Sequence, residues 1–214
     1  LYKAGMWVRD SSAGIGTMTF YVPSTGMYGG LGHPICDADT GEILPLSKGS
    51  IVGAKIQSVI PSENGRTGEL CGQFDESQQL GSLSLNTISG VYGSTKQPDS
   101  QFGLVPIALP QEVKAGPAQV ITTIDNEGPK AYDCMIEKVD LRDDDGIQNL
   151  VVRITDTQLL QKTGGIVQGM SGSPILQNGK LAGAVTHVFV NDPQRGYGIF
   201  AHTMYETAAN AAKG

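Results

Sequence analysis

Short apolar runs alternate with turn residues along most of the chain, and this pattern predicts strands rather than helices. The runs are rich in β-branched and aromatic residues and end at Gly, Pro, Asn or Asp. The clearest predicted strands are residues 17–22, 51–60, 120–124, 132–141, 150–154 and 181–190. The pair Asn178-Gly179 lies between two apolar dipeptides and predicts a tight hairpin, because Asn-Gly favours the type I′ turn.

One stretch alone has a helical pattern. Residues 202–213 are rich in Ala, the strongest helix former, and nothing interrupts the run before Gly214. The chain is therefore predicted to be all-β with a C-terminal helix, in a barrel or sandwich. Residues 96–117 are richer in Pro and Gly than their surroundings and are the predicted join between two halves of a single unit spanning 1–214.

Composition narrows the class of protein. The 29 glycines have no collagen period, hydrophobic residues make up 39%, and charged residues make up 17%, which excludes collagen, disorder and coiled coils. The net charge of −6 argues against broad nucleic-acid or anionic-membrane binding. No apolar run is long enough to span a membrane. Because the chain begins at Leu1, we expect a fragment whose export or anchoring signal lies upstream.

Cofactor and metal motifs are weak. The three cysteines, Cys36, Cys71 and Cys134, form no CxxC pair and are expected to be small buried side chains, with one disulfide plus a free thiol as the alternative. No zinc-binding spacing occurs. The acidic group of Asp140 and residues 143–145 favours a solvated turn over a Ca²⁺ site, since its spacing is not that of an EF-hand. We therefore expect neither a metal nor a cofactor.

The segment Gly169-Met170-Ser171-Gly172-Ser173-Pro174 carries the clearest chemistry. Glycines allow a tight turn with positive φ angles and leave backbone N–H groups open to a substrate oxygen. Acyl-transfer enzymes need a positioned nucleophile and preorganised oxyanion donors, and this segment can supply both. A plain Gly-Ser turn is the structural alternative.

The residues that follow strengthen the catalytic interpretation. From Gly169 the chain reads GMSGSPILQNGKLAGAVTHV, which resembles the nucleophile segment of chymotrypsin-fold serine peptidases. The similarity sharpens to one family, that of the stage IV sporulation protein B (SpoIVB) peptidases. The segments that carry this resemblance are residues 7–17 (WVRDSSAGIGT), 31–35 (LGHPI), 164–174 (GGIVQGMSGSP), 184–193 (AVTHVFVNDP) and 196–198 (GYG).

The resemblance implies a chymotrypsin-like double β-barrel and a secreted serine endopeptidase of sporulation signalling. Its implied substrate is a regulatory subunit that restrains an intramembrane protease, and family members also cleave themselves. The implied location is the space between forespore and mother cell. An upstream membrane anchor and a PDZ domain, typical of the family, are not among these 214 residues.

Ser171 is the predicted nucleophile, because Gly169 and Gly172 flank it as the family turn requires. Ser173 is the rival, but Pro174 forces extended backbone on the residue before it, which suits entry into a strand. By analogy with the fold, the N–H groups of Gly169 and Ser171 would form the oxyanion hole.

His33 is the predicted general base, since it matches the family's catalytic histidine and precedes the serine in the chain. His202, at the start of the helix, is expected to be structural. Thr186, His187 and Val188 are predicted to line the substrate site, because in this fold the strand after the nucleophile does so. His187 alternatively has a purely structural role.

The orienting acid is predicted to be Asp156, which matches the family. In the predicted strand, a period of two places it on the apolar face of Leu150, Val152 and Ile154, where a carboxylate needs a hydrogen-bonded partner. Asp156 lies only 15 residues before Ser171, however, closer than in digestive enzymes of this fold. The alternatives are Asp75, in an expected exposed turn, another acid, or a catalytic dyad without an acid.

A non-catalytic function is the second hypothesis. The same barrels could bind a peptide by adding it as a strand to an exposed edge, without turnover. The intact His33 and Ser171 favour the enzyme.

Overall fold

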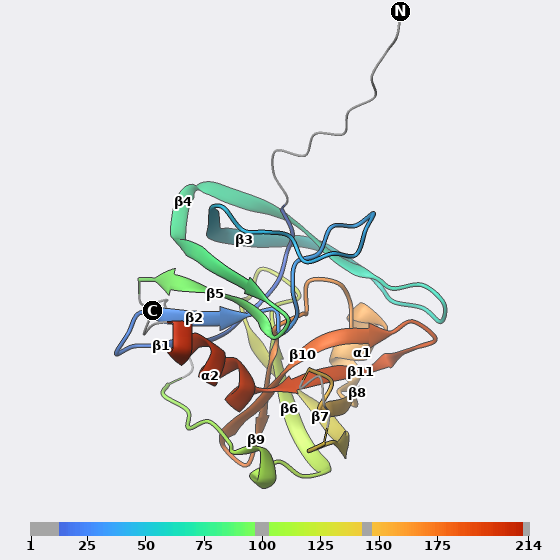
Figure 1. Cartoon of the computed structure of the whole chain (residues 1–214). Helices are drawn as coiled ribbons and strands as arrows, with labels where there is room; N and C mark the ends of the chain where they lie inside the picture. The colour runs from blue at the N-terminus through green and yellow to red at the C-terminus, as the bar shows by residue number, and fades with distance from the viewer. Residues whose placement is uncertain (1–12, 97–102, 143–146, 212–214) are drawn as a thin grey trace, which may run out of the picture.

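The computed structural model describes residues 13–96, 103–142 and 147–211, and in that part the chain forms two antiparallel β structures (Figure 1). The first is a sheet of five strands in the order β1-β2-β5-β4-β3. Its strands are β1 (Met18–Val22), β2 (Met27–Gly30), β3 (Gly49–Ile60), β4 (Glu69–Thr87) and β5 (Gly90–Thr95).

The second structure is a closed barrel in the order β10-β11-β8-β7-β6-β9. Its strands are β6 (Gly116–Thr122), β7 (Lys130–Val139), β8 (Leu150–Ile154), β9 (Pro174–Gln177), β10 (Lys180–Phe189) and β11 (Asp192–Phe200). The predicted all-β class is confirmed, and the architecture is a chymotrypsin-like double barrel. The predicted join at 96–117 begins directly after β5 and extends over the first two residues of β6, and its residues 97–102 lie outside the described part.

Period-two burial explains the strands that the sequence predicted. Along β8 the side chains of Leu150, Val152 and Ile154 are buried, while Val151 and Arg153 between them are partly exposed. The Asn178-Gly179 hairpin is confirmed: both residues have positive φ, 52° and 74°, and they join β9 to β10.

The hydrophobic pattern did not predict several of the strands. Strands β2 (MYGG) and β5 (GVYGST) contain glycines where neighbouring strands approach closely; a Cβ at Gly93 would lie 1.9 Å from the carbonyl oxygen of Ser82. Strand β4 is long and polar, so it shows no clear alternation. Asp75 lies in this strand, paired with Gly53, and not in a simple turn.

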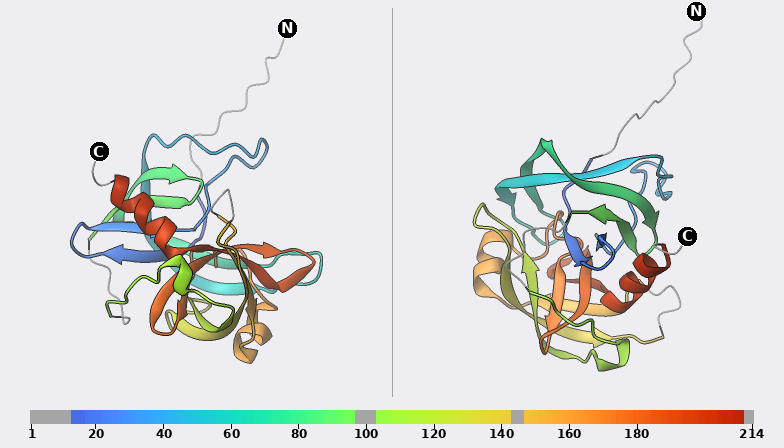
Figure 2. Two further views of the ribbon diagram at one scale, coloured as in Figure 1. Left: turned by 60° about the horizontal axis from the view of Figure 1, so that its bottom comes forward. Right: turned by 90° about the vertical axis from the view of Figure 1, so that its left-hand side faces the viewer.

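The expectation of one helix is wrong, because a second helix, α1 (Thr157–Thr163), follows β8. It is bounded by an N-cap, Asp156, and by Gly164 in the left-handed conformation. A 3₁₀ turn, Pro110–Glu112, also precedes β6. Figure 2 shows α1 and the C-terminal helix on opposite sides of the molecule.

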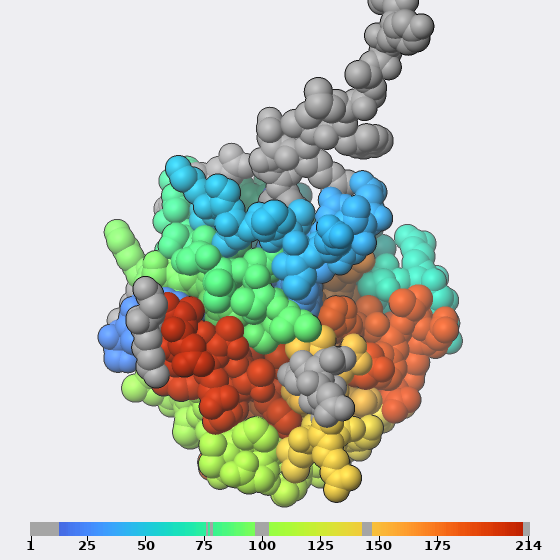
Figure 3. All heavy atoms as spheres, in the orientation of Figure 1, coloured from blue at the N-terminus to red at the C-terminus, as the bar shows by residue number. Residues whose placement is uncertain are grey.

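The predicted C-terminal helix is present as α2 (Ala201–Ala211); residues 212–213 of the prediction lie outside the described part. It packs against β10 and β11 of the second barrel and against β2 and β5 of the first sheet. Its buried side chains Met204 and Ala208 join a small core with Tyr92, Ala184 and Ile199. The helix therefore fastens the two halves together, and Figure 3 shows it (red) along their boundary.

The cysteines are not joined to one another. Cys36 is exposed, Cys71 is partly buried and Cys134 is buried, so the expected burial holds for Cys134 alone. Burial raises the pKa of the Cys134 thiol to about 12, which makes it inert at neutral pH. Separately, the described helices include none with the length and apolar character needed to cross a bilayer.

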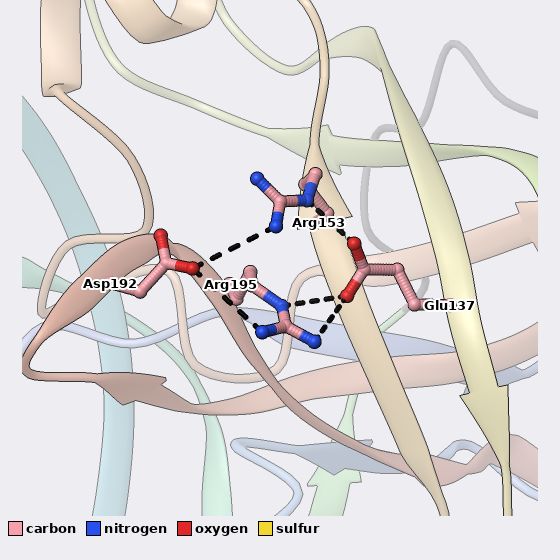
Figure 4. Close-up of polar contacts among 4 residues, drawn as sticks. All are labelled: Glu137, Arg153, Asp192 and Arg195. Atoms are coloured by element: carbon pink, nitrogen blue, oxygen red, sulfur yellow. Dashed lines mark hydrogen bonds and ion pairs between the residues drawn. The ribbon is translucent and has the colours of Figure 1, made fainter.

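Four charged side chains brace the outer face of the second barrel (Figure 4). The Glu137 carboxylate on β7 accepts hydrogen bonds of 2.6 Å from Arg153 on β8 and from Arg195 on β11. Asp192 lies 3.8 Å and 3.9 Å from the same two guanidinium groups. The Arg153 guanidinium, followed by Arg195, holds the pKa of Glu137 below its usual range.

Replacing Glu137 with Gln should therefore lower the free energy of unfolding by about 1 kcal/mol at pH 7, since the network is half-exposed. The loss should shrink as pH falls below about 4, because a carboxylate with a depressed pKa stabilises the fold only while it is ionised. Urea unfolding across pH measures this. The control is Glu127→Gln. Glu127 forms an exposed ion pair with Lys130, so its replacement should change stability little. An unchanged E137Q variant at pH 7 would refute the bracing role.

Candidate active site

The turn that carries Ser171 needs glycine on both sides. Gly169 and Gly172 have φ angles of 98° and 89°, which other residues rarely adopt. A Cβ at Gly172 would lie 2.1 Å from the carbonyl oxygen of Thr17 and 2.6 Å from the backbone nitrogen of Leu31. The backbone just before β1 and just after β2 therefore lies directly against this turn, and a residue with a Cβ would not fit at position 172.

Hydrogen bonds from the start of β1 hold the same turn. The Thr17 N–H donates to the carbonyl of Ser171 at 2.9 Å, and its hydroxyl donates to the carbonyl of Gly169 at 3.2 Å. The buried Thr19 hydroxyl donates to the carbonyl of Gly172 at 2.7 Å. These bonds join residues more than 150 positions apart and fix the Ser171 turn relative to the first half.

Two backbone amides of the turn have no hydrogen-bond partner among the described residues. The amides of Met170, Gly172 and Ser173 donate to Val167, Val185 and Met170 respectively. Within the described residues, no acceptor is recorded for the N–H groups of Gly169 and Ser171. Unpaired donors on the two sides of Met170 are what an oxyanion hole requires. This arrangement supports the predicted role of Gly169 and Ser171.

The Ser171 side chain is half-buried, and its hydroxyl donates to the carbonyl oxygen of Thr186 at 2.9 Å. The rival Ser173 differs sharply. Its hydroxyl is fully buried and has no hydrogen-bond partner among the described residues, so a substrate could not reach it. The accessible hydroxyl of the segment is therefore that of Ser171.

The loop that carries His33 lies against the serine turn and against Thr186. Leu31 and Gly32 both have positive φ, 64° and 71°, so the chain bends sharply just before the histidine. A Cβ at Gly32 would lie 2.9 Å from the Thr186 side chain, and the Leu31 nitrogen borders Gly172 as described above. Two loops that are 138 residues apart in sequence therefore meet in space.

The His33 ring is held by its own loop. Its Nδ1 lies 2.8 Å from the carbonyl oxygen of Pro34, so Nδ1 carries the hydrogen and Nε2 is the free acceptor. Burial lowers the pKa of His33, and the bond to Pro34 opposes this only in part. The imidazole is therefore neutral at pH 7, as a general base must be. No hydrogen bond links it to Ser171 in the described part of the chain.

His187 packs against His33, with ring centroids 4.7 Å apart and planes inclined by 38°. Its outer face is exposed, but loss of hydration on the packed side lowers its pKa, and the charge that His33 would carry lowers it further. Because His187 directly follows the residue that accepts the Ser171 hydrogen bond, it lies beside both predicted catalytic residues.

The predicted substrate-binding residues lie on an open edge. Strand β9 pairs with β10 only from Lys180 to Ala184, so β9 does not cover the following residues. Thr186 is buried, Val188 is partly buried, and His187 points outward between them. An extended peptide could pair with this part of β10 next to Ser171.

Asp156 is not brought to His33. Strand β8 ends at Ile154, so Asp156 lies beyond the apolar face to which the sequence pattern assigned it. One carboxylate oxygen accepts from the amides of Gln158 and Leu159 at 2.9 Å, and the other faces the amide of Asp133 at 3.4 Å. In the described residues no contact joins this carboxylate to His33. Its orienting role gains no support from these contacts.

The other candidate residues also lie in local arrangements. The Asp75 carboxylate accepts from the amide and hydroxyl of Ser77. His202 lies on α2, 3.6 Å from Glu206. Asp140 binds Lys138 and the amide of Arg142, while residues 143–145 of the acidic group lie outside the described part. Within the described ranges, no three His, Cys, Asp or Glu side chains could together hold a metal ion.

Sequence reasoning missed two partners of the site. The Pro34 carbonyl, which holds His33, is a backbone group and has no signature in the sequence. Asn86, in the run LSLNTIS, binds the backbone beside Pro34. An Asn inside an apolar strand pattern is the one signal that could have drawn attention to it, since strands disfavour Asn.

Comparison with known proteins identifies the family of the chain. A search of the curated proteins finds no significant match. A family model described as SpoIVB peptidase S55 matches residues 1–205, nearly the whole chain. With its two β structures, its serine turn and its neighbouring histidine, the chain belongs to the SpoIVB peptidase family and is a serine peptidase.

Proposed function

We propose that Ser171 and His33 form the catalytic pair of this peptidase and that it acts as an endopeptidase. The single observation that carries the proposal is the meeting of the His33 loop with the Ser171 turn, across backbone contacts that only glycines allow. The free Nε2 of a neutral imidazole and an accessible serine hydroxyl are the two groups that acyl transfer requires.

In the first step, the Ser171 hydroxyl turns from the Thr186 carbonyl toward His33. As Oγ attacks the scissile carbonyl carbon, Nε2 of His33 takes its proton. The same nitrogen then gives this proton to the leaving amine, which leaves an acyl group on Ser171. Water attacks the acyl group with His33 again as base, and the acid product leaves. Resting enzymes commonly show long or misaligned catalytic contacts before substrate binds.

The negative charge on the tetrahedral oxygen is stabilised by the unpaired amides of Gly169 and Ser171. Substrate lies along Thr186, His187 and Val188 as an added antiparallel strand, which places its scissile bond over the serine. His187 forms part of this surface and shields the His33 ring from water on one side.

Orientation of His33 is assigned to the Pro34 carbonyl, so the pair works as a dyad. This carbonyl accepts from Nδ1 and selects the tautomer with a free Nε2, the task that an aspartate performs in a triad. Asp156 instead stabilises the N-terminus of α1.

Family membership supports a biological setting for this reaction. We propose a substrate that is a regulatory protein restraining an intramembrane protease, cleaved during sporulation in the space between forespore and mother cell. Self-cleavage is part of the same proposal. The reaction needs no metal or cofactor, because the serine, the imidazole and the amides supply every group used above.

The nucleophile is tested by labelling with an active-site-directed phosphonofluoridate. Wild-type protein should be labelled at Ser171. Changing Ser171 to Ala should remove labelling and lower kcat by about 10⁶-fold, while unfolding free energy changes by only about 1 kcal/mol, the contribution of its bond to Thr186. The matched control is Ser173→Ala, which deletes an unpartnered hydroxyl and should leave labelling intact. Cleavage by S171A would place the nucleophile elsewhere.

The pH dependence of kcat/KM should have an acid limb below pH 6.5, the ordinary pKa of histidine, because burial lowers the pKa of His33. Activity should then be flat through neutrality and fall about tenfold per pH unit below the limb, as protonated His33 cannot accept the serine proton. His202→Gln, which removes a ring that lies beside Glu206 on α2, should keep this profile. A limb above pH 7 would contradict the buried neutral base.

Asp156→Ser separates the dyad from a triad. Serine keeps the N-cap but removes the carboxylate, so both stability and kcat should stay close to wild type. Asp156→Ala should lose about 1 kcal/mol of stability through loss of the cap, again with little change in kcat. If Asp156 oriented His33, kcat in both variants would instead fall by about 10⁴-fold.

A further inference from the structure

Asn86, near the end of β4, makes three hydrogen bonds to the loop that carries His33. Its Oδ1 accepts from the Ile35 N–H at 2.9 Å. Its Nδ2 donates to the carbonyl of Ile35 at 2.8 Å and to the carbonyl of Leu44 at 3.0 Å. These bonds use the acceptor and both donor hydrogens of the amide in one orientation, so the assignment of O and N is unambiguous.

The bond to Ile35 leads directly to the catalytic imidazole. The Ile35 N–H and the Pro34 carbonyl belong to the same peptide group. Asn86 accepts from one end of this group at 2.9 Å, and His33 Nδ1 donates to the other end at 2.8 Å. The hydrogen-bonded chain therefore runs from the Asn86 amide through this peptide group to the imidazole. Hydrogen bonds in such a chain polarise and strengthen one another.

The second function of the Asn86 bonds is to hold the shape of the loop. The Leu44 N–H donates to the Ile35 carbonyl at 3.0 Å, so the two arms of the loop meet at Ile35. Nδ2 of Asn86 binds one carbonyl on each arm. The peptide group that accepts from His33 therefore cannot rotate without breaking bonds to β4.

We propose that Asn86 is a positioning residue for His33: through the Pro34–Ile35 peptide group it fixes the ring orientation and the tautomer with a free Nε2. This inference rests on the proposed catalytic role of His33. In the described part of the chain, no carboxylate contacts the imidazole. The inference therefore gives the task of orienting the ring to Asn86, a side chain of the first half.

Gln177 provides a matched control within the same protein. Its Oε1 accepts from the Lys114 N–H at 3.0 Å, and its Nε2 donates to the carbonyls of Lys114 and Pro117 at 2.9 Å and 3.3 Å. It therefore clamps a backbone segment with the same three kinds of bond. Its segment runs from Lys114 into the start of β6 and does not include the His33 loop.

The experiment compares Asn86→Ala, Asn86→Asp and Gln177→Ala in the 214-residue chain. Ring ¹³C and ¹⁵N shifts of isotope-labelled histidine report the tautomer of His33, and peptide cleavage gives kcat and KM. Asn86→Ala should shift His33 toward a mixture of tautomers and lower kcat by about 10- to 100-fold, the range typical when the outer partner of a metal-bound histidine is removed. KM should change little, because Asn86 does not lie on the β10 substrate edge. Gln177→Ala should leave the tautomer and kcat unchanged.

Asn86→Asp keeps an oxygen for the Ile35 N–H but loses both donors. Asn86→Asp should retain the His33 tautomer better than Asn86→Ala does, even if the loop is less stable. If Asn86→Ala does not fold, Asn86→Asp is compared with the wild type in its place. Equal effects of N86D and N86A on the tautomer, or a wild-type tautomer and kcat in N86A, would overturn the inference. The NMR measurement of the His33 tautomer does not require an active enzyme. If phosphonofluoridate failed to label Ser171 in wild-type protein, that result would refute the catalytic proposal but not the positioning role of Asn86.

Discussion

The contact between the start of β1 and the serine turn is the interaction on which the site depends. Thr17 and Thr19 donate to carbonyls of this turn, and the absence of a Cβ at Gly172 lets the first-half backbone approach it. The proposed nucleophile, Ser171, comes from the second barrel and the proposed base, His33, from the first half, so neither half contains a complete site. Without these contacts, the side chains of Ser171 and His33 would have no fixed position relative to each other, even if each half were stable.

The site also depends on keeping an imidazole neutral, and among the described residues no carboxylate contacts it. An adjacent carboxylate would favour the protonated ring, whereas burial and a carbonyl acceptor leave His33 uncharged at neutral pH. His187 removes water from one face of that ring. The neutral partners Pro34 and Asn86 thereby orient the ring while it stays uncharged, and the carboxylate of Asp156 caps α1.

Much of this arrangement could be predicted from the sequence, and the failures have physical causes. Strands with β-branched residues and clear alternation, such as β8, were predicted with the correct ends, and so was the Asn-Gly hairpin. Glycine-rich β2 and β5 were missed because close backbone approach replaces side-chain pattern there. Asp156 was assigned to a strand face because the period-two count was extended two residues past Ile154, where β8 ends, and a helix of seven residues leaves little periodicity to detect. The Pro34 carbonyl could not be predicted, because backbone acceptors carry no residue identity.

The most direct test of the converging loops is a crystal structure of the chain with a phosphonate bound covalently to Ser171. The proposed mechanism predicts a phosphonyl oxygen within about 3 Å of the amides of Gly169 and Ser171, and Nε2 of His33 turned toward the serine oxygen. Nδ1 of His33 would still donate to Pro34. An adduct whose oxygen points away from both amides, or a His33 ring that remains remote from Ser171, would contradict it.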